Sequence, residues 1–271
     1  MSVTVGRLLS WGIVAFWLVM MGLLVRQEVL PGLRMGAPAN YRSLLGSRSE
    51  PRSVRMGIYA LDRRLGTTVS TVRPRRDGST HVTNRTEFSL GFLAHEGAAL
   101  TQLATVKSRS EIWISAACRL QSFTVRMNSP LFTIDMRGVV DGEELLFTFR
   151  AGDDAYTSRI PFDSEMPLAE SMGPIWAAGN LRVGRQWQVN VLDPRGLTLT
   201  QALVRVVGQG EARWRGETVP TYRLSVTYEG NELEAVVTED GELLEQVINW
   251  PLRLRLVREE EEDQEVGGGV R

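Results

Sequence analysis

Few residues of this chain carry a thiol or an imidazole, the side chains often used as nucleophile, general base or metal ligand. The only thiol belongs to Cys118, and the only imidazoles belong to His81 and His95. A thiol becomes a nucleophile when a base or a positive field removes its proton, but Cys118 lies in "ISAACRL", among small and apolar residues. We therefore predict a buried structural cysteine. An enzyme of unrecognised type that uses Cys118 or His95 remains an alternative.

Metal, disulfide and nucleotide chemistry leave no signature in the sequence. A single cysteine excludes an intramolecular disulfide, and two isolated histidines make a poor metal site. No phosphate-binding loop and no serine nucleophile elbow is present. We accordingly predict no cofactor, no metal site and no catalytic residue.

Large apolar residues instead recur at alternate positions along the chain. Alternate residues of a strand point to the same face, so we expect these side chains to share one dry side of a sheet. They either form a packed core or line a pocket for an apolar, lipid-like ligand, with residues 161–183 as its cover. The candidate ligand-binding residues are Trp113, Phe147, Phe149, Trp176, Trp187, Trp214, Tyr222 and Leu224.

The basic residues are unevenly distributed. Between Arg34 and Arg85 there are eleven arginines and three acids, whereas residues 86–271 carry a net charge of −10. A basic segment beside a membrane helix can lie against anionic headgroups, although a solvated basic surface is the simpler interpretation. Only Tyr41 and Tyr59 interleave this stretch, too few to stack bases, so no nucleic-acid partner is predicted. The membrane-proximal arginines are Arg34, Arg42, Arg48 and Arg52.

An apolar segment near the amino terminus predicts a membrane anchor. Leu8 to Val25 carry no charge and lie between Arg7 and Arg26; as a helix they would be about 27 Å long, close to the thickness of a bilayer core. The nearest small-residue cleavage site lies too far beyond them for a cleaved signal peptide. Thirty arginines against one lysine suggest a bacterial source. We predict a single-pass inner-membrane protein with its bulk in the periplasm, although the local arginines weakly oppose that orientation.

Beyond this anchor (residues 1–26), the pattern divides the chain into a linker (27–53), a β-domain (54–258) and a disordered tail rich in acids and glycines (259–271). Asp141-Gly142 and Asp240-Gly241 between alternating runs are strong hairpin signals. Such short turns predict antiparallel pairing. The expected fold is mainly β, a large curved antiparallel sheet that is half-barrel or barrel-like, covered by a loop with one short helix near Leu168–Met172.

Four short motifs resemble a known family by their order along the chain. They are "VRMGIYALDRRLGTTVSTV", "MPLAESMGPIW", "VGRQWQVNVLDP" and "EARWRGETVPTYRLSVTYEG". Together they resemble the β-rich domain that precedes the catalytic core of bacterial transglutaminase-like membrane proteins, which is distantly similar to the lipoprotein-carrier (LolA-like) half-barrels. The resemblance spans about residues 54–258. It implies a curved sheet that could hold lipid, and the family's Cys, His and Asp core has no counterpart in the motifs.

These observations predict a non-enzymatic, membrane-anchored envelope module. Its partner would be an envelope protein or an apolar ligand such as a lipid. An accessory or structural subunit of a membrane complex is the alternative, with Trp11, Trp17 and the anchor's glycines as a helix contact.

Overall fold

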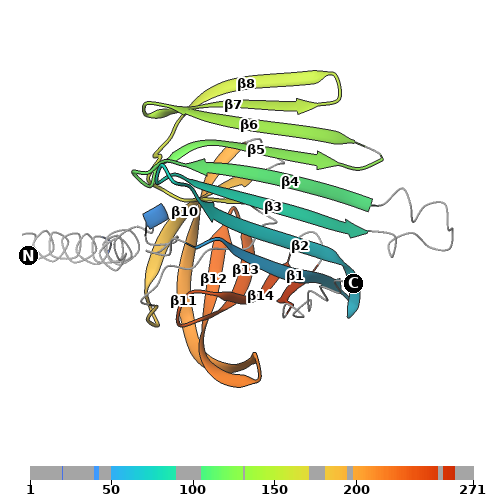
Figure 1. Ribbon diagram of the computed structural model, residues 1–271, viewed down its shortest axis with the longest axis vertical. Coiled ribbons are helices and arrows are strands. Elements are labelled where there is room, and N and C mark those ends of the chain that lie inside the picture. Colours follow the sequence, from blue (N-terminus) through green and yellow to red (C-terminus); the bar gives the residue numbers. More distant parts are fainter. Residues whose placement is uncertain are drawn as a thin grey trace, which may run out of the picture.

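Fifteen strands of this protein form one β-sheet (Figure 1). The structure is a computed structural model that describes residues 20, 40–42, 50–89, 105–130, 132–170, 181–193, 198–249 and 253–259. The strands are β1 (Arg52–Ala60), β2 (Arg63–Pro74), β3 (Thr80–Ser89), β4 (Thr105–Ile114), β5 (Leu120–Asn128), β6 (Thr133–Asp141), β7 (Glu144–Ala151), β8 (Asp154–Pro161), β9 (Leu168–Glu170), β10 (Gln186–Asp193), β11 (Thr198–Trp214), β12 (Glu217–Tyr228), β13 (Asn231–Thr238), β14 (Leu243–Asn249) and β15 (Arg253–Arg258).

The sheet is open and almost wholly antiparallel, as the turn signals predicted. Its order is β8-β7-β6-β5-β4-β3-β2-β1-β15-β14-β13-β12-β11-β10-β9, so most strands lie beside their neighbours in sequence. Gly142 and Gly241 adopt positive φ in the predicted hairpin turns. Among the described strands, the one long-range antiparallel pair is β1 with β15, which joins the two halves of the sheet.

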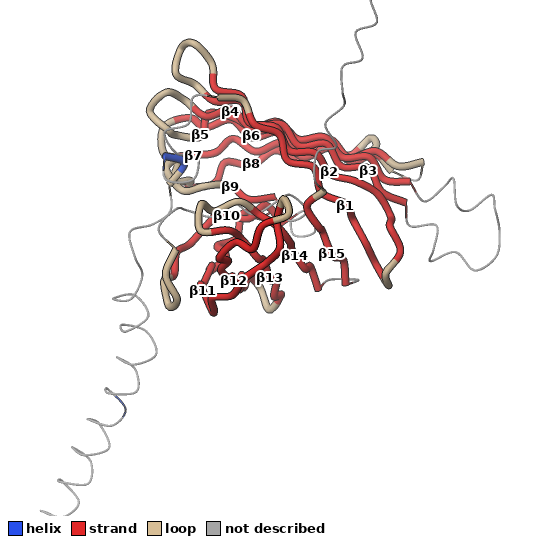
Figure 2. The backbone as a smooth tube through the Cα atoms, turned by 60° about the horizontal axis from the view of Figure 1, so that its bottom comes forward, coloured by secondary structure: helices blue, strands red, loops and turns tan. Residues whose placement is uncertain are grey.

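The sheet curves so strongly that its two halves face each other (Figure 2). Phe88 on β3 and Val106 on β4 belong to the same buried cluster as Ala202 on β11. Leu168 of β9, at one end of the strand order, is buried with Phe147 of β7, near the other end, in a cluster that includes no residue of β10 to β15, as expected if the sheet bends back on itself. We call the face that carries this core the inner face.

A second buried cluster occupies the inner face of β2 to β7. It includes Phe123, Leu145 and Phe147, and Leu168 of β9 belongs to it. Tyr41, from the predicted linker, is buried in the same cluster, and its hydroxyl accepts a hydrogen bond from the Leu168 N–H at 2.9 Å. Burial raises the pKa of Tyr41 far above its usual value. A residue of the predicted linker is thus part of the core.

A polar strip crosses the inner face of β2, β3 and β4. The hydroxyl of Thr68 donates to Asn84 Oδ1 at 2.8 Å and lies 2.8 Å from the Thr86 hydroxyl. Ser70 and Ser110 are also buried there. Buried hydroxyl and amide groups are tolerated when they bond to one another, and this strip does so through Thr68.

The predicted short helix near Leu168–Met172 is wrong where the structure describes it. Leu168 to Glu170 form β9, which pairs with β10 in parallel. The Asn190 N–H also bonds to the Pro167 carbonyl oxygen at 2.8 Å, so this pairing extends into the preceding loop. Residues 171–180 lie outside the described residues.

The predicted membrane anchor and most of the predicted linker and tail also lie outside the described residues. In the part of the chain that the structure describes, no helix has both the length and the apolar character needed to cross a bilayer.

Candidate anion-binding face

A row of arginines crosses the outer face of the sheet, perpendicular to the strands. Strand register places each residue of the row opposite its neighbour, with Val69 of β2 and Asp135 of β6 filling the two gaps. The members of this arginine row are Arg55 of β1, Arg85 of β3, Arg109 of β4, Arg126 of β5 and Arg150 of β7.

The spacing of the row follows from the sheet itself. Hydrogen-bonded strands lie about 4.8 Å apart, so the row spans about 29 Å from β1 to β7. Arg85, Arg109 and Arg126 are on three consecutive strands and directly opposite one another. Like charges directly opposite across a strand pair are destabilising, so folding alone does not favour this arrangement.

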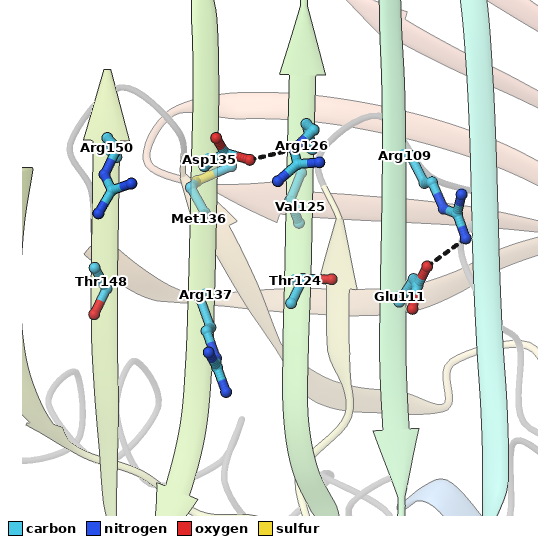
Figure 3. Close-up of a pocket in the computed structure, with 10 residues that line it drawn as sticks. All are labelled: Arg109, Glu111, Thr124, Val125, Arg126, Asp135, Met136, Arg137, Thr148 and Arg150. Carbon is cyan, nitrogen blue, oxygen red and sulfur yellow. Dashed lines mark hydrogen bonds and ion pairs between the residues drawn. The ribbon is translucent and has the colours of Figure 1, made fainter. Parts of the chain in front are cut away.

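The row lies in two adjoining depressions of the outer face. One, of about 710 Å³, extends over β4 to β7 (Figure 3), and the other, of about 340 Å³, extends over β1 to β5. Arg109 lines both, so we treat them as one groove. Seven basic and three acidic side chains line it, a net charge of +4. The lining charges are Arg55, Arg85, Lys107, Arg109, Arg126, Arg137, Arg150, Glu87, Glu111 and Asp135.

Acidic neighbours neutralise part of the row. Arg126 Nε donates to Asp135 Oδ1 at 2.5 Å, and Arg109 Nη2 lies 2.6 Å from Glu111 Oε1 (Figure 3). The hydrogen bond and charge of Asp135 raise the pKa of Arg126 above its usual value. Within the described residues, no acidic side chain forms an ion pair with Arg85, Arg137 or Arg150.

A second row, in which three of the five residues are threonines, runs beside the arginine row, two residues along each strand. Thr83, Glu111, Thr124, Arg137 and Thr148 face one another in register from β3 to β7. Thr124 and Thr148 line the larger depression with Arg137 (Figure 3). A hydroxyl donates one hydrogen bond and accepts others, so this row offers neutral donors beside the guanidinium groups.

An aromatic cluster borders the groove. The rings of His81 and Trp113 stack with their centroids 3.9 Å apart, and the Arg75 guanidinium lies 4.4 Å from the Trp113 ring. His81 Nε2 is 3.5 Å from Glu111 Oε2, so Glu111 lies between His81 and Arg109. Burial lowers the pKa of His81, and the charge of Glu111 opposes that shift.

The predicted apolar site residues do not lie together. Trp187, Tyr222 and Leu224 belong to the first cluster, and Phe147, with Phe149 packed against it, to the second. Trp214 ends β11 with its ring 4.7 Å from the Arg258 guanidinium, and Trp176 lies outside the described residues.

The expectation that Trp113 shares this dry side is wrong. Ile112 and Ile114 are buried on the inner face, so strand alternation directs Trp113 outward, where it stacks on His81.

Cys118 is not fully buried as predicted. It is half-buried in the turn between β4 and β5, with φ of 60° and its N–H bonded to the Ser115 carbonyl oxygen at 2.9 Å. His95 lies outside the described residues. Nowhere in the described residues do three or more histidine, cysteine, aspartate or glutamate side chains gather as a metal site.

The predicted membrane-proximal arginines are only partly described. Arg34 and Arg48 lie outside the described residues; Arg42 is exposed, and Arg52 begins β1.

Sequence reasoning missed the arginine row although its signal was present. Each of the segments "NRT", "SRS", "VRM" and "FRA" contributes one arginine on the polar face of a strand. Aligning those strands through their hairpin turns would have placed the arginines opposite one another. The basic stretch at residues 34–85 contains only two of the five arginines of the row, and the other three lie beyond it.

Comparison with known proteins supports the fold and no more. The sequence matches no family model and no curated protein. A β-barrel-like protein of the domain of unknown function DUF1849 from Brucella abortus aligns with a TM-score of 0.52 at 9% identity, covering 79% of this chain and 98% of that one. A DUF1089 family protein from Pseudomonas aeruginosa aligns with a TM-score of 0.35 at 13% identity, covering 65% and 87%. The chain is therefore similar in fold to the β-barrel-like DUF1849 protein.

Proposed function

We propose that this protein is a non-enzymatic binding module that holds an anionic ligand on the outer face of β1 to β7. The observation that carries the proposal is the direct opposition of Arg85, Arg109 and Arg126 on neighbouring strands. Anionic groups between these guanidinium groups would replace their mutual repulsion with charge-assisted hydrogen bonds. Arginine suits phosphate, sulfate and carboxylate because its planar fork donates two parallel bonds.

The groove favours an extended ligand without bases. The row is about 29 Å long and open to solvent, and none of the aromatic side chains that the structure describes lines the two depressions. Binding of single-stranded nucleic acid usually relies on aromatic platforms on which bases stack. A sulfated or phosphorylated polymer, or an acidic protein segment, matches the groove better.

The proposed cellular location of the module is based on the sequence alone. An uncleaved anchor at residues 8–25 would place it on the bacterial inner membrane, with the β-domain in the periplasm. The kinship to the β-domain of transglutaminase-like membrane proteins belongs to the same proposal, as does the role of accessory subunit in a membrane complex.

The test is binding of fluorescent heparin, a sulfated polysaccharide, to the full-length chain in non-ionic detergent. We expect binding at low ionic strength that weakens steeply as salt screens the charges. The double variant Arg85→Gln/Arg109→Gln should bind about tenfold more weakly, because each exposed charge contact is worth up to about 1 kcal/mol.

The matched control is Arg205→Gln/Arg223→Gln, which removes two exposed arginines from β11 and β12. It lowers the net charge equally, so it should keep almost all the affinity. Equal losses in the two double variants would mean that net charge, and not the row, attracts the polymer.

A second candidate is an apolar ligand on the inner face, favoured by one observation. Tyr156, 52% exposed, lies opposite the partly buried Phe149 at the open edge of the sheet. Native mass spectrometry of the full-length chain, released from detergent, would detect a co-purified lipid. If Phe149→Asn left the amount of bound lipid unchanged, this candidate would fail.

A further inference from the structure

Glu259 lies at one end of the arginine row. Its N–H donates to the Arg55 carbonyl oxygen at 3.0 Å, and its carboxylate is 2.5 Å from Arg64 Nη2 and 3.8 Å from Arg55 Nε. Gly57 leaves room for that carboxylate, because a Cβ at this position would lie 2.6 Å from Glu259 Oε1. The side chain of the residue after β15 is therefore already held on the outer face, beside the first arginine of the row.

Residues 260–265, which follow Glu259, are mostly acidic and so complement the positive charge of the groove. Five of the six residues from 260 to 265 are acidic: Glu260, Glu261, Glu262, Asp263 and Glu265. The groove has a net charge of +4, and Arg85, Arg137 and Arg150 lack an acidic partner within the described residues. Charge complementarity therefore favours this segment as an occupant.

The segment is long enough to reach the middle of the row. Arg85 and Arg109 lie three and four strands from β15, or about 14 and 19 Å at 4.8 Å per strand. Six residues span at most about 20 to 22 Å when extended. Residues 260–265 can therefore extend from Glu259 to Arg109.

We infer that the acidic segment 260–265 of this same chain binds along Arg85 and Arg109 and competes with the external anionic ligand. The inference rests on the groove of the proposed function and adds a regulator to it. A segment tethered a few residues away has an effective concentration in the millimolar range. Weak contacts between exposed charges therefore suffice to hold it at low salt, and salt should release it.

The direct test measures a distance in the full-length chain in non-ionic detergent. In a Cys118→Ser background, spin labels at Thr83→Cys on β3 and Val266→Cys after the acids should give one short, narrow separation at low ionic strength. That separation should lengthen and broaden when Glu260, Glu261, Glu262 and Glu265 become Gln and Asp263 becomes Asn. Arg85→Gln/Arg109→Gln should have the same effect, and Arg205→Gln/Arg223→Gln should have none. One distance distribution in all four proteins would overturn the inference.

Heparin binding separates this inference from the proposed function. Neutralising the segment should tighten heparin binding at least about fivefold, a typical lower value for coupled sites, and only while Arg85 and Arg109 are present. Heparin bound equally with and without the acids would refute the competition and leave the groove's function standing. If heparin bound neither protein while the short separation still depended on the two arginines, the external-ligand function would fail and the internal contact would stand.

Discussion

Arg85 illustrates a conflict between stability and binding in one side chain. It faces Arg109 directly across the β3–β4 pair, and opposed like charges cost about 0.2 to 1 kcal/mol. We predict that Arg85→Gln raises the melting temperature by about 1 °C in the chain whose acidic segment 260–265 is neutralised, while weakening heparin binding. Thermal unfolding followed by circular dichroism measures the first effect, with Arg205→Gln as the control. A lower melting temperature for Arg85→Gln would show that the row is not repulsive.

Thr68 is the hydrogen-bonding centre of the buried polar strip. Replacing it with valine keeps its volume but removes the donor to Asn84 Oδ1 and the partner of the Thr86 hydroxyl. We predict that Thr68→Val lowers the free energy of unfolding by about 1 to 3 kcal/mol, the cost of leaving buried polar groups unsatisfied. Thr68→Ser, which keeps the hydroxyl, should lower the free energy of unfolding clearly less, as measured by urea denaturation. An equal decrease in both variants would mean that the methyl group matters and the hydrogen bonds do not.

His81 should make stability depend on pH in one direction. Burial lowers the pKa of its imidazole in the folded protein, and Arg75 and Arg73 add to this, whereas Glu111 opposes it. The unfolded chain, with a pKa of about 6.5, then binds more protons than the folded chain as the pH falls through that value. Stability is therefore full above about pH 6.5 and declines below it, towards the folded pKa.

The urea midpoint between pH 7.5 and pH 5.5 measures this decline. His81→Phe keeps a ring against Trp113 and should flatten the profile. A profile unchanged by His81→Phe would assign the pH dependence to other groups.

Alternation predicted which residues share a face, but not which face is dry. The recurrence of large apolar residues at alternate positions predicts Trp113 on the dry side, yet it lies outward beside His81. Thr68 and Asn84 are polar and yet point inward. Where both faces of a strand carry mixed residues, the dry side depends on what the sheet packs against, and that information is not local to the strand.

Gly138 of β6 leaves space for the ring of Phe123 on the neighbouring strand β5. It faces Phe123 in register, and a Cβ at Gly138 would overlap the fully buried Phe123 ring. We predict that Gly138→Ala destabilises the protein by about 1 to 3 kcal/mol through overpacking. The control is Gly210→Ala on β11, where a Cβ would meet only Thr221 Oγ1 at an ordinary 3.6 Å. The added variant Phe123→Leu should recover part of the loss in chemical denaturation, and no recovery would argue against a clash with this ring.

The hairpins were predictable because their signals are local. Asp141-Gly142 and Asp240-Gly241 combine a residue that tolerates a tight turn with a glycine at positive φ. β9 was not predictable in this way, because its three residues pair with a strand about twenty residues further along the chain. The arginine row required the register of seven strands together, which no single segment encodes.

The pairing of β1 with β15 makes the two halves of the sheet one structure. Four register pairs, from Met56 with Arg258 to Tyr59 with Arg255, join them. Leu256 lies at this junction, almost fully buried, opposite Ile58 and Gln246. We predict that Leu256→Ala lowers the free energy of unfolding by about 2 to 5 kcal/mol. Both halves of the sheet should still unfold in one transition.

Hydrogen exchange of β4 and β12 under increasing urea measures whether the halves unfold together. Coincident midpoints in the wild type and in Leu256→Ala would confirm one cooperative unit. Separate midpoints would show that the two halves are independent folding units.

The sequence is compatible with both a half-barrel and a closed barrel-like form. In its described residues, the structure shows a sheet that does not close. β8 and β9 end the strand order. Whether a sheet closes depends on its accumulated twist and curvature, which the hydrophobic pattern of individual strands does not specify.

The position of β15 beside β1 also determines when the protein can fold. During synthesis β1 emerges about two hundred residues before its second neighbour, so one edge of the first hairpins stays unpaired while most of the chain is being made. Contacts between such distant segments form slowly, and an exposed strand edge can pair with other chains. The nascent protein therefore requires protection from aggregation until its last strand is available.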